Sequence, residues 1–108
     1  MDLTLVQRSQ DYLLASHVNK SQYTALLMMV AGHLNYKVGK FCHLMQNLHV
    51  YDRHFDALNE ILAREPLDVQ PKLILKSNKN FYNYTIDDFE ITGIENIKKI
   101  ESPLEIAI

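Results

Sequence analysis

The chain has 108 residues, 47% hydrophobic and 22% charged, a composition typical of folded domains and unlike that of disordered, collagenous or disulfide-stapled proteins. Its formal net charge of −2 lacks the basic excess that phosphate-backbone binding requires, so we expect no nucleic-acid partner. A single cysteine cannot form an intrachain disulfide, and the longest apolar stretch, residues 25–31, is too short to cross a membrane. We therefore expect one cytoplasmic domain over residues 1–108, with no membrane partner.

The first third of the sequence predicts a strand followed by a helix. Residues 2–9 alternate as a half-buried strand does, and a polar loop over residues 10–20 comes next. Asn19 is a good N-cap for the helix, and a glutamine three residues later completes a capping box. Apolar residues cover most sides of this helix, so we expect it to be buried, and Asn35 or Gly39 ends it.

The rest of the chain predicts three further strands and one helix. Residues 40–51 alternate over a long strand, and a second helix begins with Asp52 as a plausible N-cap and ends before Pro66. Shorter strands are expected at residues 72–76 and 86–92. The order β-α-β-α-β-β indicates an α+β fold in which a mixed β-sheet packs against helices.

Polar residues near the end of the first strand each admit a functional and a structural interpretation. Arg8 and Ser9 could hold a phosphate, although a solvent-exposed arginine beside a turn-forming serine gives the same pattern. The amide of Asn19 could match the edge of a pyrimidine, but a helix N-cap explains it equally. Asp11 also fits a turn. Spacing alone favours the structural interpretation for all four residues.

The histidines and the cysteine also admit a functional and a structural interpretation. His49 and Tyr51 lie on one face of the long strand, where their polar tips could reach one ligand, or simply form an amphipathic pair at a sheet edge. The spacings of His43, His49 and His54 match no zinc signature, so we expect no metal. Cys42 shares a face with apolar residues and points away from His43, which predicts a buried, inert thiol.

Taken in order, these motifs resemble one known family. The chain contains Gln-Arg-Ser-x-Asp at 7–11, Asn19, His-x-Tyr at 49–51, Arg-Glu-Pro at 64–66 and Asp-Phe-Glu-Ile-x-Gly at 88–93. In this order and spacing they resemble the C-terminal part of thymidylate synthase. The resemblance runs over nearly the whole chain but covers less than half of a family member, and it implies the C-terminal portion of that fold. The family's Pro-Cys-His segment, which carries the nucleophilic cysteine, lies upstream of the matched part.

The resemblance implies a methyltransferase that converts dUMP to dTMP, with methylenetetrahydrofolate as co-substrate and dihydrofolate as by-product. A cysteine thiolate adds to the uracil ring and activates it, and the folate carries the one-carbon unit. The implied partners are dUMP, folate and a second copy in a homodimer. Because the nucleophilic cysteine lies outside the matched part, we expect the isolated chain to be inactive. A dUMP hydroxymethylase and a non-catalytic nucleotide-binding remnant stay open as alternatives.

The resemblance also implies roles for individual residues in the nucleotide site. Arg8 and Ser9 match the residues that bind the phosphate. Asn19 matches the asparagine that pairs with the uracil edge and serves catalysis; relatives that use dCMP carry Asp there, so Asn19 favours uracil. His49 and Tyr51 match the pair that binds the 3′-hydroxyl of the deoxyribose.

The folate site is implied by fewer residues. Asp11 matches the aspartate that contacts the pterin and supports a catalytic water network, and Ala107 and Ile108 match the tail that closes over bound folate. The sequence departs from the family pattern at residues 15–18, which lead to the asparagine, and at residues 94–98. The resemblance is therefore closer for phosphate and uracil recognition than for folate binding and closure of the tail.

Overall fold

A computed structural model describes residues 1–95 and 97–106 of the chain. Its strands and α-helices follow the predicted order: β1 (Leu3–Asp11), α1 (Ser16–His33), β2 (Phe41–His49), α2 (Phe55–Leu62), β3 (Lys72–Leu75) and β4 (Phe89–Thr92). Among the helices described, none combines the length and the apolar character needed to span a membrane. The predicted α+β class is thus confirmed.

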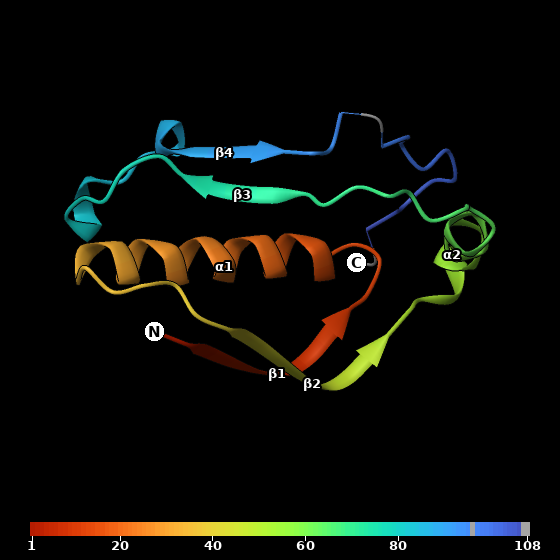
Figure 1. Ribbon diagram of the computed structural model, residues 1–108. Coiled ribbons are helices and arrows are strands. Elements are labelled where there is room, and N and C mark those ends of the chain that lie inside the picture. The colour runs from red at the N-terminus through yellow and green to blue at the C-terminus, as the bar shows by residue number, and fades with distance from the viewer. Residues whose placement is uncertain (96, 107–108) are drawn as a thin grey trace.

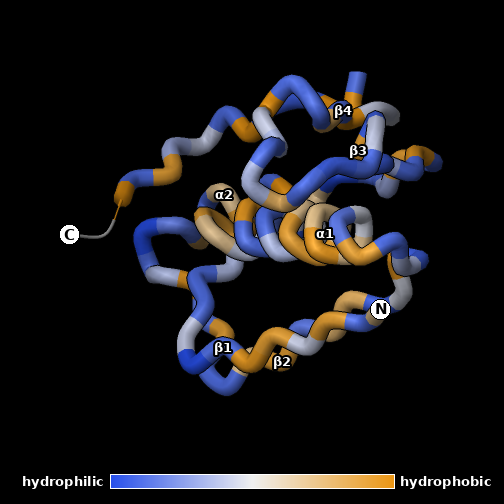
Figure 2. Tube along the Cα trace, turned by 90° about the vertical axis from the view of Figure 1, so that its left-hand side faces the viewer, coloured by the Kyte–Doolittle hydropathy of each residue, from blue (hydrophilic) through white to orange (hydrophobic). Residues whose placement is uncertain are grey.

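Helix α1 forms a middle layer between two small sheets (Figure 1). On one side β1 and β2 run parallel, with Leu3 opposite Phe41 and Asp11 opposite His49. On the other side β3 and β4 pair antiparallel. The described strands therefore divide between a parallel and an antiparallel sheet, each with two strands. Figure 2 shows the same layers from the side, with apolar residues along α1 and along β1 and β2.

The core lies along α1 because this helix has a layer on both sides. Leu27 and Ala31 are 2% and 0% exposed. Gly32 allows the loop before β4 to approach the helix closely, since a Cβ at this position would meet the Oη of Tyr84 at 2.6 Å. The prediction of a helix buried on most sides holds only in part: residues 23–32 are buried or half-buried, whereas most of the first two turns is exposed.

The start of α1 differs from the prediction, and its end agrees with it. Asn19 is not the N-cap: the helix begins at Ser16, and Ala15 occupies the cap position without a side-chain hydrogen bond. The expected loop of residues 10–20 shrinks accordingly, because β1 continues to Asp11. At the other end Asn35 adopts a left-handed conformation with φ 56°. The N–H of Asn35 and of the following tyrosine donate to carbonyls of the last turn, which is the usual way to end a helix at such a residue.

Three other local predictions need correction. Asp52 begins a short 3₁₀ turn instead of capping α2, whose N-cap position is His54. The strand expected from residue 86 starts only at Phe89, since residues 86–88 form another 3₁₀ turn. Cys42 is exposed instead of buried. Alternation along β2 separates two faces correctly, but α1 covers the face of Phe41, and Cys42 lies on the other.

Candidate functional site at the carboxyl ends of β1 and β2

The parallel pairing of β1 and β2 brings several of the predicted site residues to one edge of the sheet. Ser9 pairs with Asn47 and Asp11 with His49, so both strands end at the same level. Beyond them, the N–H of Tyr12 donates to the carbonyl of His49 over 2.9 Å and extends the pairing by one residue. The carboxyl ends of parallel strands are a common location for ligand sites, because the chain turns away there and leaves polar groups accessible.

Arg8 and Ser9 are adjacent in sequence but differ in their surroundings. Arg8 is exposed, with Val6 on the uncovered face of the sheet, and its guanidinium makes no hydrogen bond or ion pair to residues 1–95 or 97–106. Ser9 is half-buried on the face that α1 covers. The backbone carbonyl of Ser9 accepts a 2.9 Å hydrogen bond from Nε2 of Gln7. The guanidinium of Arg8 is thus available to an anion.

Asn19 lies in the second turn of α1, and its side chain reaches back to β1. Its Oδ1 accepts a 3.1 Å hydrogen bond from Nε2 of Gln10 and is 3.5 Å from Nε2 of Gln7. Gln10 is 1% exposed. Two strand glutamines therefore contact the asparagine that the sequence resemblance places at the nucleobase.

Neither glutamine has a role that the sequence predicts. Gln7 was noted only as part of a motif, although its place on the covered face of β1 was a usable signal for a polar contact with α1. Its Oε1 also accepts from Nε2 of His43 at 2.8 Å, so this histidine carries its proton on Nε2. Gln10 carried no comparable signal, because it stood in the expected loop.

Asp11 has a structural task at the turn between β1 and α1. Its Oδ1 accepts hydrogen bonds from the backbone N–H groups of Leu13, at 3.0 Å, and Leu14, at 3.2 Å. These bonds satisfy donors that the turn would otherwise leave open, as a side-chain cap does for a helix. Oδ2 makes no hydrogen bond to the described residues and remains an acceptor for a ligand.

His49 and Tyr51 lie together, as predicted, and are joined by a third ring. The His49 and Tyr51 rings meet edge to face with centroids 5.1 Å apart, and Tyr51 meets His54 in the same way at 6.0 Å. His54 is fully buried, and its Nε2 donates to the carbonyl of Glu105 over 2.7 Å. The spacing of His54 matched no zinc signature; in the structure this residue links the sheet edge to the C-terminal segment.

Glu60 in α2 and Arg64, two residues after the end of that helix, hold the C-terminal segment of residues 98–102. The guanidinium of Arg64 donates to the backbone carbonyls of Lys98 and Lys99 and to the carboxylate of Glu60. That carboxylate also accepts from the backbone N–H groups of Ser102, at 2.9 Å, and Glu101, at 3.0 Å. The amide of Ser102, followed by that of Glu101, lowers the pKa of Glu60 from 4.5 to about 2.

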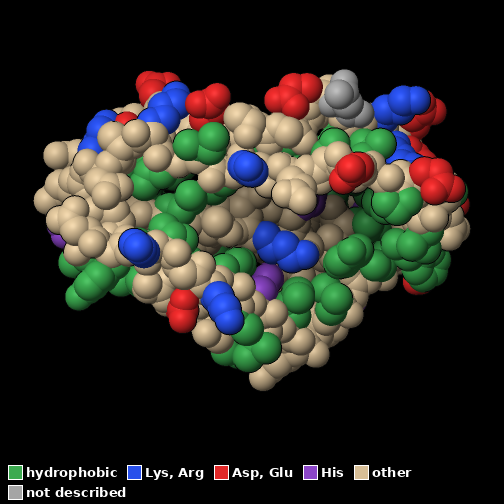
Figure 3. All heavy atoms as spheres, in the orientation of Figure 1, with side chains coloured by type: hydrophobic (Ala, Val, Ile, Leu, Met, Phe, Trp, Pro, Cys, Tyr) green, Lys and Arg blue, Asp and Glu red, His purple; other side chains and the backbone are tan. Residues whose placement is uncertain are grey.

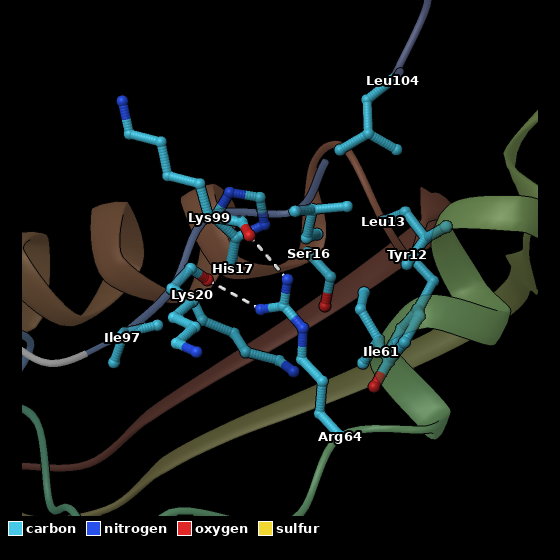
Figure 4. A pocket seen from close by; sticks show the side chains of 12 residues that line it. Tyr12, Leu13, Ser16, His17, Lys20, Ile61, Arg64, Ile97, Lys99 and Leu104 are labelled. Carbon is cyan, nitrogen blue, oxygen red and sulfur yellow. Dashed lines mark hydrogen bonds between the residues drawn. The ribbon is translucent and has the colours of Figure 1, made fainter. Parts of the chain in front are cut away.

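A pocket of about 610 Å³ opens between the start of α1, α2 and the C-terminal segment. Figure 4 shows Arg64 on its wall, turned toward the carbonyl of Lys99, with Leu13, Ser16 and Ile61 nearby. None of the described residues predicted for the nucleotide or folate site lines this pocket. We place the candidate site at the sheet edge because side-chain chemistry converges there.

Charge and possible metal ligands are distributed unevenly. Figure 3 shows Lys and Arg side chains near the centre of one face, so positive charge is concentrated locally although the chain is acidic overall.

In the part of the chain that the structure describes, no three His, Cys, Asp or Glu side chains gather as metal ligands would. His43 and His54 instead hydrogen-bond to Gln7 and to a backbone carbonyl.

The chain matches known proteins along almost its entire length. The family model for thymidylate synthase matches residues 1–106. Thymidylate synthase from Streptococcus gordonii is 46% identical over 100 residues, which cover 91% of this chain and 36% of that protein. The enzyme from Streptococcus pyogenes is 45% identical over 100 residues, with the same coverage of both. This chain therefore spans little more than a third of the length of these curated relatives.

Structural similarity leads to the same family. The chain matches thermostable thymidylate synthase A from Bacillus subtilis with a TM-score of 0.85 and 31% sequence identity, over 99% of this chain and 38% of that one. The path of the backbone is thus shared over almost the whole of this chain. The chain belongs to the thymidylate synthase family.

Proposed function

We propose that the protein containing this chain converts dUMP to dTMP with methylenetetrahydrofolate, and that this chain supplies most of the groups that recognise the nucleotide. The observation that carries the proposal is the meeting of Ser9, Asp11 and His49 at one sheet edge in a chain of this family. A nucleoside monophosphate offers a dianion, a sugar hydroxyl and a base edge. The sheet edge and its neighbours offer a cation, hydroxyl and imidazole groups, and an amide.

Each part of dUMP has a proposed partner. Arg8 and Ser9 bind the phosphate. The guanidinium of Arg8 has no ion-pair partner among the described residues, and Arg forms strong charge-assisted hydrogen bonds with phosphate oxygens. The amide of Asn19 binds the uracil edge and holds the ring for reaction. His49 and Tyr51, whose rings already pack together, bind the 3′-hydroxyl.

The folate has one proposed partner in the described residues. Oδ1 of Asp11 is bonded to the turn, while Oδ2 bonds to none of residues 1–95 and 97–106, so the carboxylate is fixed and can accept from N–H groups of a pterin. When bound, methylenetetrahydrofolate supplies the one-carbon unit and the reducing equivalents. Ala107 and Ile108, proposed to close over the folate, lie outside the described residues. The contacts of His54 and Arg64 hold the segment that leads to them.

The uncovered face of β1 and β2 supports a proposed homodimer. A cytoplasmic location is proposed separately, from the single cysteine alone. Val6, Leu44 and Leu48 on this face are 62%, 52% and 49% exposed. Val6 and Leu44 are partners across the two strands, and exposed apolar side chains gathered on a regular sheet are typical of an interface between proteins. A second copy of the same sheet would cover them in a symmetric pair.

The proposal is tested by product formation with two forms of the protein. The complete polypeptide encoded by the gene is expected to form dTMP from dUMP and methylenetetrahydrofolate, whereas the purified 108-residue chain is expected to form none. Formation of dTMP by the chain alone would contradict the second expectation. A product heavier than dTMP by one oxygen atom would identify a hydroxymethylase. Binding of dUMP without formation of any product would identify a non-catalytic protein.

A matched pair of variants tests the phosphate partner. Arg8→Ala in the complete protein is expected to raise the KM for dUMP about tenfold or more, because a charge-assisted contact is lost. Lys40→Ala removes a charge at the opposite end of the sheet and is expected to leave that KM within about twofold. Equal effects of both substitutions would show that Arg8 does not contact the phosphate.

A further inference from the structure

The side chain of Gln10 is almost completely buried beside a residue proposed to bind the substrate. Its Nε2 donates to the backbone carbonyl of Asp11 at 3.1 Å and to Oδ1 of Asn19 at 3.1 Å. Its Oε1 is buried and has no hydrogen-bond partner in the described part of the chain. Burying Oε1 without a partner among the described residues costs free energy, so the two hydrogen bonds of Nε2 are what hold this amide in place.

These contacts determine which way the amides point. A backbone carbonyl can only accept hydrogen bonds, so the group of Gln10 that faces the carbonyl of Asp11 must be its NH₂. The same NH₂ faces Asn19, which must therefore present its oxygen. Gln7 repeats the argument independently, because its Nε2 is fixed by the carbonyl of Ser9 and also approaches Oδ1 of Asn19. Two backbone carbonyls thus impose one orientation on Asn19.

The consequence is a defined donor at the proposed nucleobase position. With Oδ1 turned toward the glutamines, Nδ2 of Asn19 is the end left for a ligand, and it makes no hydrogen bond within residues 1–95 and 97–106. A base that carries a carbonyl oxygen at the facing position can accept from it. A base that carries an amino group there would place one N–H against another.

We propose that Gln10 is a positioning residue that prevents the Asn19 amide from turning over, and that it thereby favours uracil over cytosine nucleotides. This inference rests on the proposed function, since it concerns the same nucleotide site. Turning over the amide would place Nδ2 of Asn19 against Nε2 of Gln10 and leave two donors facing each other in a buried place. Gln10 is the stronger of the two constraints, because its bond to Asn19 is 3.1 Å whereas the contact from Gln7 is 3.5 Å.

The test uses Gln10→Met in the complete protein, because methionine keeps the length of the side chain but removes the donor. Binding of dUMP and of dCMP is measured by calorimetry in the absence of folate. The ratio of the two affinities is expected to fall about tenfold in Gln10→Met. Gln22→Met, an exposed position one turn further along α1, is the matched control and is expected to keep the ratio. Thermal unfolding of both variants checks that they are folded.

The outcomes separate this inference from the proposed function. Loss of a buried residue with only a structural role would lower the affinities for dUMP and dCMP in parallel. An unchanged ratio of the two affinities in a folded Gln10→Met protein therefore overturns the inference and leaves the proposed function standing. Absence of dUMP binding by the unaltered protein overturns both. Side-chain amide exchange measured by NMR gives a reading without nucleotide: the Nε2 protons of Gln10 are expected to exchange much more slowly than those of Gln22. Equal exchange rates would overturn the inference.

Discussion

The sheet edge and the C-terminal segment are both fixed by side chains that bond to backbone groups, but the partners lie at very different distances along the chain. At the sheet edge Gln7, Gln10, Asp11 and Asn19 are close in sequence, and the hydrogen bonds that join them to one another and to neighbouring backbone groups span at most twelve positions. Gln7 also bonds to His43, 36 positions away on the paired strand. The C-terminal segment is held by His54, Glu60 and Arg64, which bond to groups 34 to 51 positions later.

This difference has consequences for stability. The contacts between residues 7 and 19 at the sheet edge join groups that are close in sequence. Each of them can therefore orient a side chain without the entropy cost of closing a long loop. The contacts from α2 must close long loops, and the entropy lost in doing so is offset only while all of them are formed. Substitutions at the sheet edge should therefore alter the chemistry of the site, whereas substitutions around α2 should loosen the C-terminal segment.

The largest effect on stability is expected from His54→Ala. The substitution empties a fully buried position and removes the hydrogen bond to the carbonyl of Glu105, so the complete protein should lose about 3 kcal/mol of unfolding free energy. Urea denaturation measures this loss. His17→Ala, at an exposed position of α1, is the control and should change stability by less than about 0.5 kcal/mol. Similar losses for both would show that the His54 contact does not stabilise the fold.

A smaller effect, with a different signature, is expected at Asp11. Asp11→Ala removes the acceptor for the N–H groups of Leu13 and Leu14 and should cost about 1 kcal/mol in urea denaturation, as loss of a helix cap does. Asp11→Asn keeps an oxygen acceptor but loses the charge. Asp11→Asn should therefore have the stability of the unaltered protein. Both Asp11→Ala and Asp11→Asn should raise the KM for methylenetetrahydrofolate. Recovery of folate binding in Asp11→Asn would show that the free carboxylate oxygen is not needed by the folate.

Sequence patterns predicted the elements around the sheet edge because those patterns are local. Alternation identified β1 and β2 and helical spacing identified α1, although β1 extends two residues beyond the predicted end at residue 9. The capping box at Asn19 was misleading: it has the right residue types, but the carboxylate of Asp11 already bonds to the turn that leads into α1. A local pattern therefore predicted the helix and misplaced its first residue.

The contacts around α2 and the face of Cys42 could not be predicted in the same way. The bonds from Arg64 and His54 end on backbone carbonyls, which every residue has and which leave no trace in the sequence. Alternation in β2 distinguishes two faces, but only the position of α1 decides which one is covered. Gln10 shows the same limit at the sheet edge, since its burial depends on how the strand end meets the helix.

The smallest expected effect is a pH dependence confined to the C-terminal segment. Bonds from the amides of Ser102 and Glu101 lower the pKa of Glu60 to about 2, below its ordinary value of 4.5. The carboxylate therefore contributes its full stabilisation above pH 4.5, and this contribution is lost as the pH falls toward 2. Hydrogen exchange at the two amides, corrected for the intrinsic pH dependence of exchange, should show protection decreasing over this window.

Glu60→Gln separates the charge of this contact from its shape. The amide keeps one oxygen for the backbone N–H groups of Glu101 and Ser102 but no longer titrates, and it loses the charge that pairs with Arg64. We expect several-fold faster exchange of the two amides at pH 7 and no change in protection between pH 4.5 and 2. The urea midpoint of the whole protein should hardly move, because the pair lies near the surface. A pH dependence of protection that persists in Glu60→Gln would mean that another group titrates. A large fall in the urea midpoint would mean that the C-terminal segment unfolds together with the sheet edge instead of separately from it.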